Sequence, residues 1–390
     1  MSSNRDEGGD DGVEWFTYSG GIVPSGVKCT NILVKGTTRI DKSAFENCRD
    51  HLRVVEICEG VKEIGSRAFH GCQHLERVKF PFTLTSIESN AFCGCKSLKS
   101  VELCEGLESV GYGAFKGCYS LEFINLPSTV TSIEDATFPG CEALESIAIP
   151  SSVTSIGEYA FHSCISLESI SIPPPVTSIG LGAFKGCKKL KEVTFQPPHQ
   201  LRAIYRGAFQ NCFALEVIKI PHTVTELSWH SFYFCKNLNM VDLCGGSPYV
   251  NLNAFGKCPK LDHGNIIANG KMDIDTFKRF AWADLSRRIG SLTYQRKAMI
   301  ETKLNAIPNL IVVDGRVPQL MHDSLTKVHG LITYWELKES TTILELAVWN
   351  LSLDGEIGVE TRQNIRKQCG RDMQIIMSGV LQFFDYNTGE

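Results

Sequence analysis

The chain has 390 residues, enough for two domains, and 43% of them are hydrophobic, which excludes a protein that is disordered throughout. Its formal net charge is -4 and its pI is near 6.2, so bulk electrostatic attraction to nucleic acid is excluded and we expect no nucleic-acid partner. No uninterrupted apolar run reaches about 18 residues, so we also expect no membrane span.

The chain begins with an acidic, glycine-rich segment, residues 1–12, which read MSSNRDEGGDDG. Such a segment cannot bury enough apolar surface to order itself, so we predict a disordered tail. It has no apolar core and no small-residue cleavage site, so we expect no secretory signal and a location in the cytoplasm, with the nucleus as the second compartment. Residues 13–31 contain Trp15-Phe-Thr-Tyr18, a predicted short strand, and are expected to cap the open end of the region that follows.

From Ile32 to Leu261 one sequence motif is repeated about ten times. Each repeat has a cysteine three residues after a phenylalanine, and successive cysteines are 23 residues apart, except for 24 once and 25 once. These cysteines are Cys48, Cys72, Cys95, Cys118, Cys141, Cys164, Cys187, Cys212, Cys235 and Cys258. A period in the low twenties with a Leu-x-x-Ile-x-Ile core is typical of leucine-rich repeats, in which each unit stacks only on its neighbours.

Each repeat is predicted to form two short strands. The segment Leu-x-x-Val-x-Leu alternates as a half-buried strand does, and entry from the preceding coil makes the sheet parallel. A second apolar pair, such as Val153 and Ile156, follows a turn residue and forms the convex side. Then comes Ala-Phe, and the stacked phenylalanines are predicted to form a buried spine.

The full repeat Leu-x-x-Ile-x-Ile-Pro-x-x-Val-Thr-x-Ile-Gly-x-x-Ala-Phe-x-x-Cys resembles the BspA-type leucine-rich repeat. The runs Leu98–Leu107 and Ser163–Phe184 are most similar to the diatom forms of this family. The resemblance implies a repeat solenoid with a parallel β-sheet on one side and short strands and turns on the convex side. It also implies an interaction scaffold without catalysis.

Sixteen cysteines raise the question of disulfides. Cysteines one repeat apart would lie near 5 Å between Cα atoms, within the range that a disulfide needs. Without a secretory route we predict free thiols, each a small buried residue with a weak donor.

The strand positions on either side of the buried residue are predicted to point to the concave face of the solenoid. They would carry recognition of a protein partner, with Phe123 as the strongest anchor because it is an exposed aromatic on a rigid sheet. The candidate residues are Arg77, Lys79, Ser100, Glu102, Phe123, Asn125, Ser146, Ser169, Glu192 and Lys219.

After Leu261 the period stops, and residues 262–390 read as a mostly α-helical region. Tyr334, Leu337, Leu344, Val348 and Leu351 keep a three-four spacing, for example, which is typical of one helix face. We expect this region to cap the far end of the solenoid. A basic cluster there consists of Arg287, Arg288, Arg296, Lys297 and Lys303. It is compatible with contact to RNA or to an acidic protein, but the pattern favours a solvated helix face.

No phosphate-binding glycine loop, nucleophile elbow or zinc pair is present, so we expect no enzyme, no metal and no cofactor. His70, His74 and Cys93 come nearest to a metal-ligand set, and we attribute them to coincidence. Two functions remain: a scaffold inside the cell that binds a protein through its concave face, and a cell-surface adhesion or recognition protein.

Overall fold

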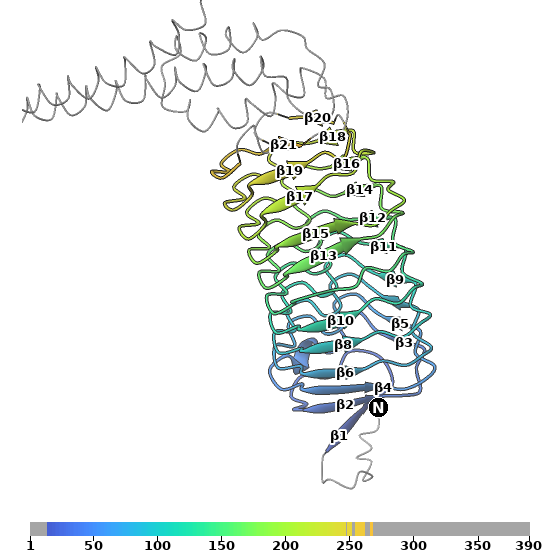
Figure 1. Cartoon of the computed structure of the whole chain (residues 1–390). Helices are drawn as coiled ribbons and strands as arrows, with labels where there is room; N and C mark the ends of the chain where they lie inside the picture. Colours follow the sequence, from blue (N-terminus) through green and yellow to red (C-terminus); the bar gives the residue numbers. More distant parts are fainter. Residues whose placement is uncertain (1–13, 247, 252–253, 262–265, 268–390) are drawn as a thin grey trace, which may run out of the picture. The chain divides into compact units, whose positions relative to one another are not determined.

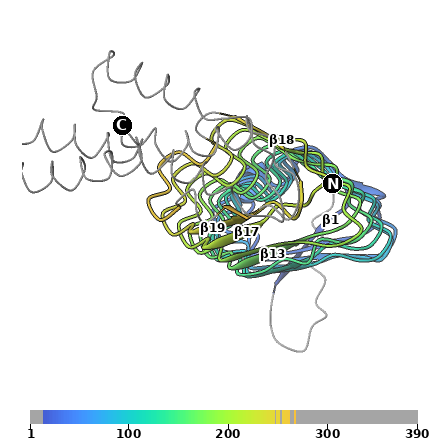
Figure 2. The ribbon, with the colours of Figure 1, turned by 45° about the horizontal axis from the view of Figure 1, so that its top comes forward.

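The computed structural model describes residues 14–246, 248–251, 254–261 and 266–267. Over this stretch the chain winds into stacked coils, which we number 1 to 10 by their cysteines, from Cys48 to Cys258 (Figure 1). Each coil has two sides that bear strands: β13, β17 and β19 lie on one side and β18 on the other (Figure 2). The predicted parallel solenoid is therefore confirmed.

The longer strands form the first series, in which every pairing is parallel. A shift of one repeat relates paired residues, as for Val55 with Val78 and Ile170 with Val193. The strands are β1 (Trp15–Tyr18), β2 (Asn31–Val34), β4 (Val54–Ile57), β6 (Arg77–Lys79), β8 (Ser100–Glu102), β10 (Phe123–Asn125), β13 (Ser169–Ile172), β15 (Glu192–Phe195), β17 (Val217–Lys219), β19 (Met240–Asp242) and β21 (Ile266–Ile267).

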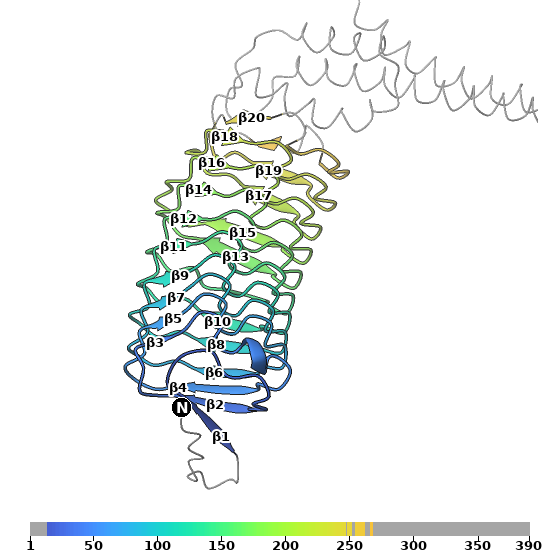
Figure 3. The same ribbon diagram turned by 180° about the vertical axis from the view of Figure 1, so that it is seen from behind.

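The second series consists of two-residue strands and is seen with the first in the view from behind (Figure 3). In each pair the second residue is apolar and buried, as in Ile156 and Ile179, so the ladder lines the core from the convex side. The strands are β3 (Arg39–Ile40), β5 (Glu63–Ile64), β7 (Ser86–Ile87), β9 (Ser109–Val110), β11 (Ser132–Ile133), β12 (Ser155–Ile156), β14 (Ser178–Ile179), β16 (Ala203–Ile204), β18 (Glu226–Leu227) and β20 (Tyr249–Val250), and one short 3-10 helix, η1 (Glu46–Cys48), lies in coil 1.

A stack of phenylalanine rings runs through the core, one ring from each coil. Neighbouring rings are nearly parallel, with centroids 4.6 to 5.8 Å apart. At the amino-terminal end the stack continues into Tyr18 of β1, 4.9 Å from Phe45. The Tyr18 hydroxyl donates to the carbonyl of Gly21, and burial raises its pKa to about 12. Tyr18 therefore covers the end ring within the predicted cap segment.

The cysteine of each coil lies beside this ring stack and is buried. In coils 3 to 10 its thiol donates to the carbonyl of the phenylalanine in the preceding coil, at 3.1 to 3.3 Å. Burial raises the pKa of Cys72 and of Cys164 to about 12, so both thiols stay protonated near neutral pH. The cysteine column therefore consists of protonated thiols that can donate hydrogen bonds, as burial of the cysteines predicts.

The predicted sheet of about ten strands is interrupted. Among the long strands no pairing joins β6 to β8 or β15 to β17. Ser146–Ala148 form no strand, although Ile147 is still buried, and no pairing joins β9 to β11. The widest ring separation, 5.8 Å between Phe115 and Phe138, lies in the same coils. Thr137 stands there in the alanine column and is buried, but the Phe115 main-chain amide donates to its carbonyl at 2.9 Å, so the two coils stay hydrogen-bonded beside the ring stack.

The predicted domain boundaries can be compared with the residues that the structure describes. The long series does not end at Leu261, because β21 pairs with β19 beyond it. The predicted tail, residues 1–12, and the predicted helical region, residues 262–390, lie outside the described residues apart from β21.

Candidate functional site

The concave face, the side of the long strands that faces away from the core, presents the residues that the sequence singled out. The alternation of the strands buries Val101 and Ile124 and turns the residues beside them outward. Nine of the ten predicted residues are exposed, and Asn125 is half-buried. The prediction of which side chains point outward therefore agrees with the structure.

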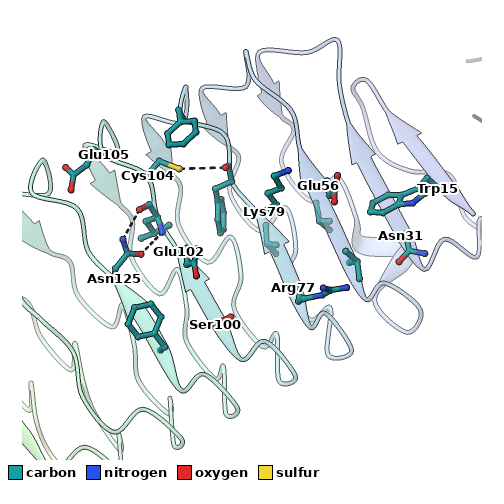
Figure 4. Close-up of a pocket in the computed structure, with 17 residues that line it drawn as sticks. Trp15, Asn31, Glu56, Arg77, Lys79, Ser100, Glu102, Cys104, Glu105 and Asn125 are labelled. Carbon is teal, nitrogen blue, oxygen red and sulfur yellow. Dashed lines mark hydrogen bonds between the residues drawn. The ribbon is translucent and has the colours of Figure 1, made fainter. Parts of the chain in front are cut away.

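A hollow of ≈ 1020 Å³ lies on this face between β1 and β10. Arg77, Lys79, Ser100, Glu102, Phe123 and Asn125 line it, with Trp15 at one end (Figure 4). Six of the ten candidates are thus brought together in one place. The floor is formed by strands held by core packing, so a ligand would meet a rigid surface there.

Two aromatic side chains that line the hollow are exposed. Phe123 on β10 is 51% exposed, and Phe82, which follows β6 in a turn, is 79% exposed. The Phe82 and Thr83 main-chain amides donate to the two carboxylate oxygens of Glu59 one coil earlier, which fixes the turn that carries the ring. Sequence reasoning missed Phe82, although it is the one aromatic in a turn column that otherwise holds residues such as Glu59, Glu105 and Ser128.

The centre of the hollow is basic and its sides are acidic. Arg77 and Lys79 lie on β6, between Glu56 on β4 and Glu102 on β8. Among the described residues neither Arg77 nor Lys79 forms an ion pair. Two cations without a partner beside exposed rings can accept a carboxylate and an apolar side chain from the same ligand.

Asn125 has a structural role that the sequence did not reveal. Its Oδ1 accepts from the Leu103 main-chain amide at 2.6 Å, and its Nδ2 donates to the Leu103 carbonyl at 2.9 Å (Figure 4). The side-chain amide thus continues the ladder beyond the end of β8. Both of its hydrogen-bonding groups are occupied, so Asn125 shapes the hollow and is a poor candidate for direct recognition.

The remaining candidates lie farther along the face. Glu192 and Lys219 line a second, smaller hollow of ≈ 400 Å³ together with His199 and Cys244. Ser146 and Ser169 line neither of these two hollows. The structure therefore divides the predicted surface into a large hollow, a small hollow and a plain stretch between them.

The described residues offer little for catalysis or for metal binding. Within the part of the chain that the structure covers, no three histidine, cysteine or acidic side chains are grouped so as to hold a metal ion. Burial raises the pKa of the Cys104 thiol at the hollow, and the carboxylates of Glu59 and Glu102 add to the effect, so this thiol is a weak nucleophile. No helix of the described chain is long and apolar enough to cross a bilayer.

The repeat matches a known family over most of the solenoid. The model of the BspA type leucine rich repeat region, in six copies, matches residues 27–145 and 154–279. The chain belongs to this family. None of the curated proteins is a significant match to this BspA-type protein.

Solved structures of bacterial leucine-rich repeat proteins are similar to this BspA-type chain. A leucine-rich cell surface protein from Faecalibacterium prausnitzii has 23% identity and a TM-score of 0.46, over 65% of this chain and 84% of that one. The leucine-rich repeat protein of T. pallidum has 25% identity and a TM-score of 0.35, over 52% and 82%. One from Bacteroides ovatus has 23% identity and a TM-score of 0.34, over 66% and 91%.

Proposed function

We propose that this BspA-type protein is a non-catalytic scaffold that binds a protein partner in the large hollow of its concave face. One observation carries the proposal: the hollow joins two exposed rings, Phe82 and Phe123, to two cations without an ion-pair partner, Arg77 and Lys79. Aromatic and arginine side chains at the centre of a rigid surface are the residues that most often dominate protein interfaces.

The partner contact that fits this hollow is a segment with an apolar anchor next to a carboxylate. The apolar group would pack against Phe123, and the carboxylate would lie between Arg77 and Lys79. The acidic side chains of Glu56 and Glu102 beside them disfavour a partner with uniform negative charge, because like charges would face each other.

Affinity capture with matched variants tests the proposal. The double variant Arg77→Glu and Phe123→Ala should lose the partners that the natural protein captures from native lysate, as measured by quantitative mass spectrometry. The control is Ser146→Ala, on the same face but outside both hollows, which should keep them. Circular dichroism melting must be the same for all three proteins. Retention of every partner by the double variant would sink the concave-face proposal and direct attention to residues 262–390.

The proposal includes a location in the cytoplasm, with the nucleus as the second compartment. The buried cysteine thiols donate hydrogen bonds to phenylalanine carbonyls, and this arrangement suits a reducing compartment. Alkylation of the denatured protein without reductant should then modify nearly all sixteen cysteines. The proposal also includes that the chain is most similar to the diatom members of the BspA-type family.

The alternative is recognition at a cell surface through the same hollow. Cell fractionation separates the two locations, since recovery of the protein in the medium or on the surface would reverse the choice. The capture experiment does not depend on that outcome, because it tests the hollow itself.

A further inference from the structure

Charge is divided unevenly along the solenoid. Residues 105–168 contain nine acidic side chains and one lysine, whereas residues 185–260 contain ten lysines and arginines and four acidic side chains. Seven of these lysines lie in the turn between the buried phenylalanine and the next long strand. Lys191 is paired with Glu168, 3.1 Å away, and the other six, which we name the basic corner, are Lys185, Lys188, Lys189, Lys236, Lys257 and Lys260.

The lysines of the basic corner are available for a ligand. Five of the six are exposed, and Lys185 is half-buried. None of them forms an ion pair with a carboxylate of the described chain. Among the described residues of the same turns in coils 7 to 10 the one acidic side chain is Glu216, so acidic side chains there offset little of the positive charge.

Three half-buried rings, Phe213, Tyr233 and Phe234, are interleaved with these lysines. The Lys236 ammonium lies 4.6 Å from the centre of the Phe213 ring and 5.1 Å from that of Phe234. The Lys257 ammonium lies 5.6 Å from Tyr233 and 5.9 Å from Phe234. These cation–π contacts hold two of the charges in place, so less ordering entropy is lost when a ligand binds.

Coils 9 and 10 place bulky residues in a left-handed backbone position. Phe234 and Lys257 occupy it with φ of 63° and 57°. Five other coils have glycine in this column at positive φ, namely Gly71, Gly94, Gly117, Gly140 and Gly186, and the small polar residues Ser163 and Asn211 occupy it in coils 6 and 8. Bulky residues disfavour this conformation, and such strain concentrates at functional sites. Coils 9 and 10 therefore present a ring and a cation outward at a conformational cost.

We propose that the basic corner binds an extended, acidic segment of another polypeptide. The rings of coils 7, 8 and 9 are 5.2 Å apart at each step, so Lys188 and Lys236 lie two layers, about 10 Å, apart along the array. An extended polyproline II chain rises about 3.1 Å per residue with three residues per turn, so every third side chain lies on the same face, about 9 Å apart. Carboxylates at every third position of such a segment would thus meet Lys188 in coil 7 and Lys236 in coil 9.

The chemistry favours a polypeptide over single-stranded nucleic acid. Lysine ammonium groups already lie over all three rings, whereas stacking of bases requires open ring faces. All six cations are lysines, and the forked guanidinium that binds phosphate in a bidentate manner is missing from this set.

Fluorescence anisotropy of the full chain tests the proposal. The probe is a labelled peptide with glutamate at every third position between glycine and serine. It should bind at least about tenfold more tightly than a glycine-serine peptide or an oligouridylate of equal length, and its affinity should fall with salt. Equal binding of the glycine-serine peptide, or tighter binding of the oligouridylate, would overturn the proposal.

Two variants locate the binding. Phe234→Gly with Lys257→Gly installs the residue found in five other coils, so the melting temperature should stay the same or rise while affinity falls at least about tenfold. Lys188→Glu with Lys236→Glu should have the same effect on affinity. Lys96→Glu is the matched control, because Lys96 lies in the same column in coil 3. A loss of affinity in the control equal to that of the variants would place the binding elsewhere and refute the proposal.

Discussion

The buried column and the exposed columns of the same coils follow different patterns. In the buried column the ring is phenylalanine in all ten coils, from Phe45 to Phe255, and each is at most 2% exposed. In the exposed column that opens each long strand the residue changes from Arg77 to Ser100 to Phe123 in successive coils. Identical layers can stack only if their inner side chains match, whereas the outer positions have no such neighbour constraint. The outer columns are therefore where specificity can be encoded.

The largest expected effect comes from removing one ring of the stack. Phe161 is fully buried between Phe138 and Phe184, with centroids 5.4 and 5.1 Å away. Phe161→Ala should lower the free energy of unfolding by about 3–5 kcal/mol, because it removes buried surface and leaves a cavity. In a repeat array the loss should appear as an earlier, separate transition in urea denaturation.

Phe123→Ala is the matched control for that substitution. The same side chain is removed, but from a position that is 51% exposed, and stability should change by less than about 0.5 kcal/mol. Equal losses in the two variants would contradict the distinction between the buried and the exposed columns.

A second effect should come from the thiol column at high pH. Burial raises the pKa of Cys72 and of Cys164 from 9.0 to about 12, so folding favours the protonated thiol. This stabilisation is fully present below about pH 9 and is lost as the pH rises toward about 12. Because every coil repeats the burial, the melting temperature should fall steeply over this range.

Substitution of these two thiols provides the control. A variant with Cys72→Ala and Cys164→Ala should melt lower at neutral pH but lose less on going to high pH, since two of the titrating groups are gone. Melting followed by circular dichroism across this range measures both slopes. Parallel slopes for the two proteins would show that lysine and tyrosine titration dominates instead.

The repeat allowed much of the fold to be predicted, because a column that recurs ten times reports the same burial ten times. The parallel register, the ring stack and the buried cysteines all follow from it. The interruption near Phe138 was not predicted, because Ser146–Ala148 keep the alternating pattern of the other long strands, with Ile147 buried. The helical region predicted for residues 262–390 lies outside the described residues apart from β21 and stays a prediction.

The candidate site was predicted less completely than the fold. Alternation along a strand shows which side chains face outward, and Arg77, Lys79 and Phe123 are exposed as it predicts. It cannot show how turns fold over the strand ends, so Phe82 was missed. It also cannot separate a side chain used for structure from a free one, so Asn125 was included.

A smaller effect is expected at Asn125, whose side chain is half-buried and so belongs to neither the buried nor the exposed columns. Asn125→Ala removes both hydrogen bonds to the Leu103 main chain, and we expect a loss of about 1–2 kcal/mol in the free energy of unfolding. Ser100→Ala, exposed on the neighbouring strand, should change stability by less than about 0.5 kcal/mol. Urea denaturation of both variants measures the difference, and a neutral Asn125→Ala would return Asn125 to the candidates for direct recognition.

The smallest effect is expected from an ion pair between exposed columns. The Lys191 ammonium lies 3.1 Å from the Glu168 carboxylate one coil earlier, but the two side chains are 63% and 52% exposed. Water and salt screen such a pair, so Lys191→Ala should change the free energy of unfolding by less than about 0.5 kcal/mol. If urea denaturation shows a loss above about 1 kcal/mol in the free energy of unfolding, ion pairs between neighbouring coils help to hold the coils together. The exposed columns would then be constrained by stacking as the rings are, and less free to vary for recognition.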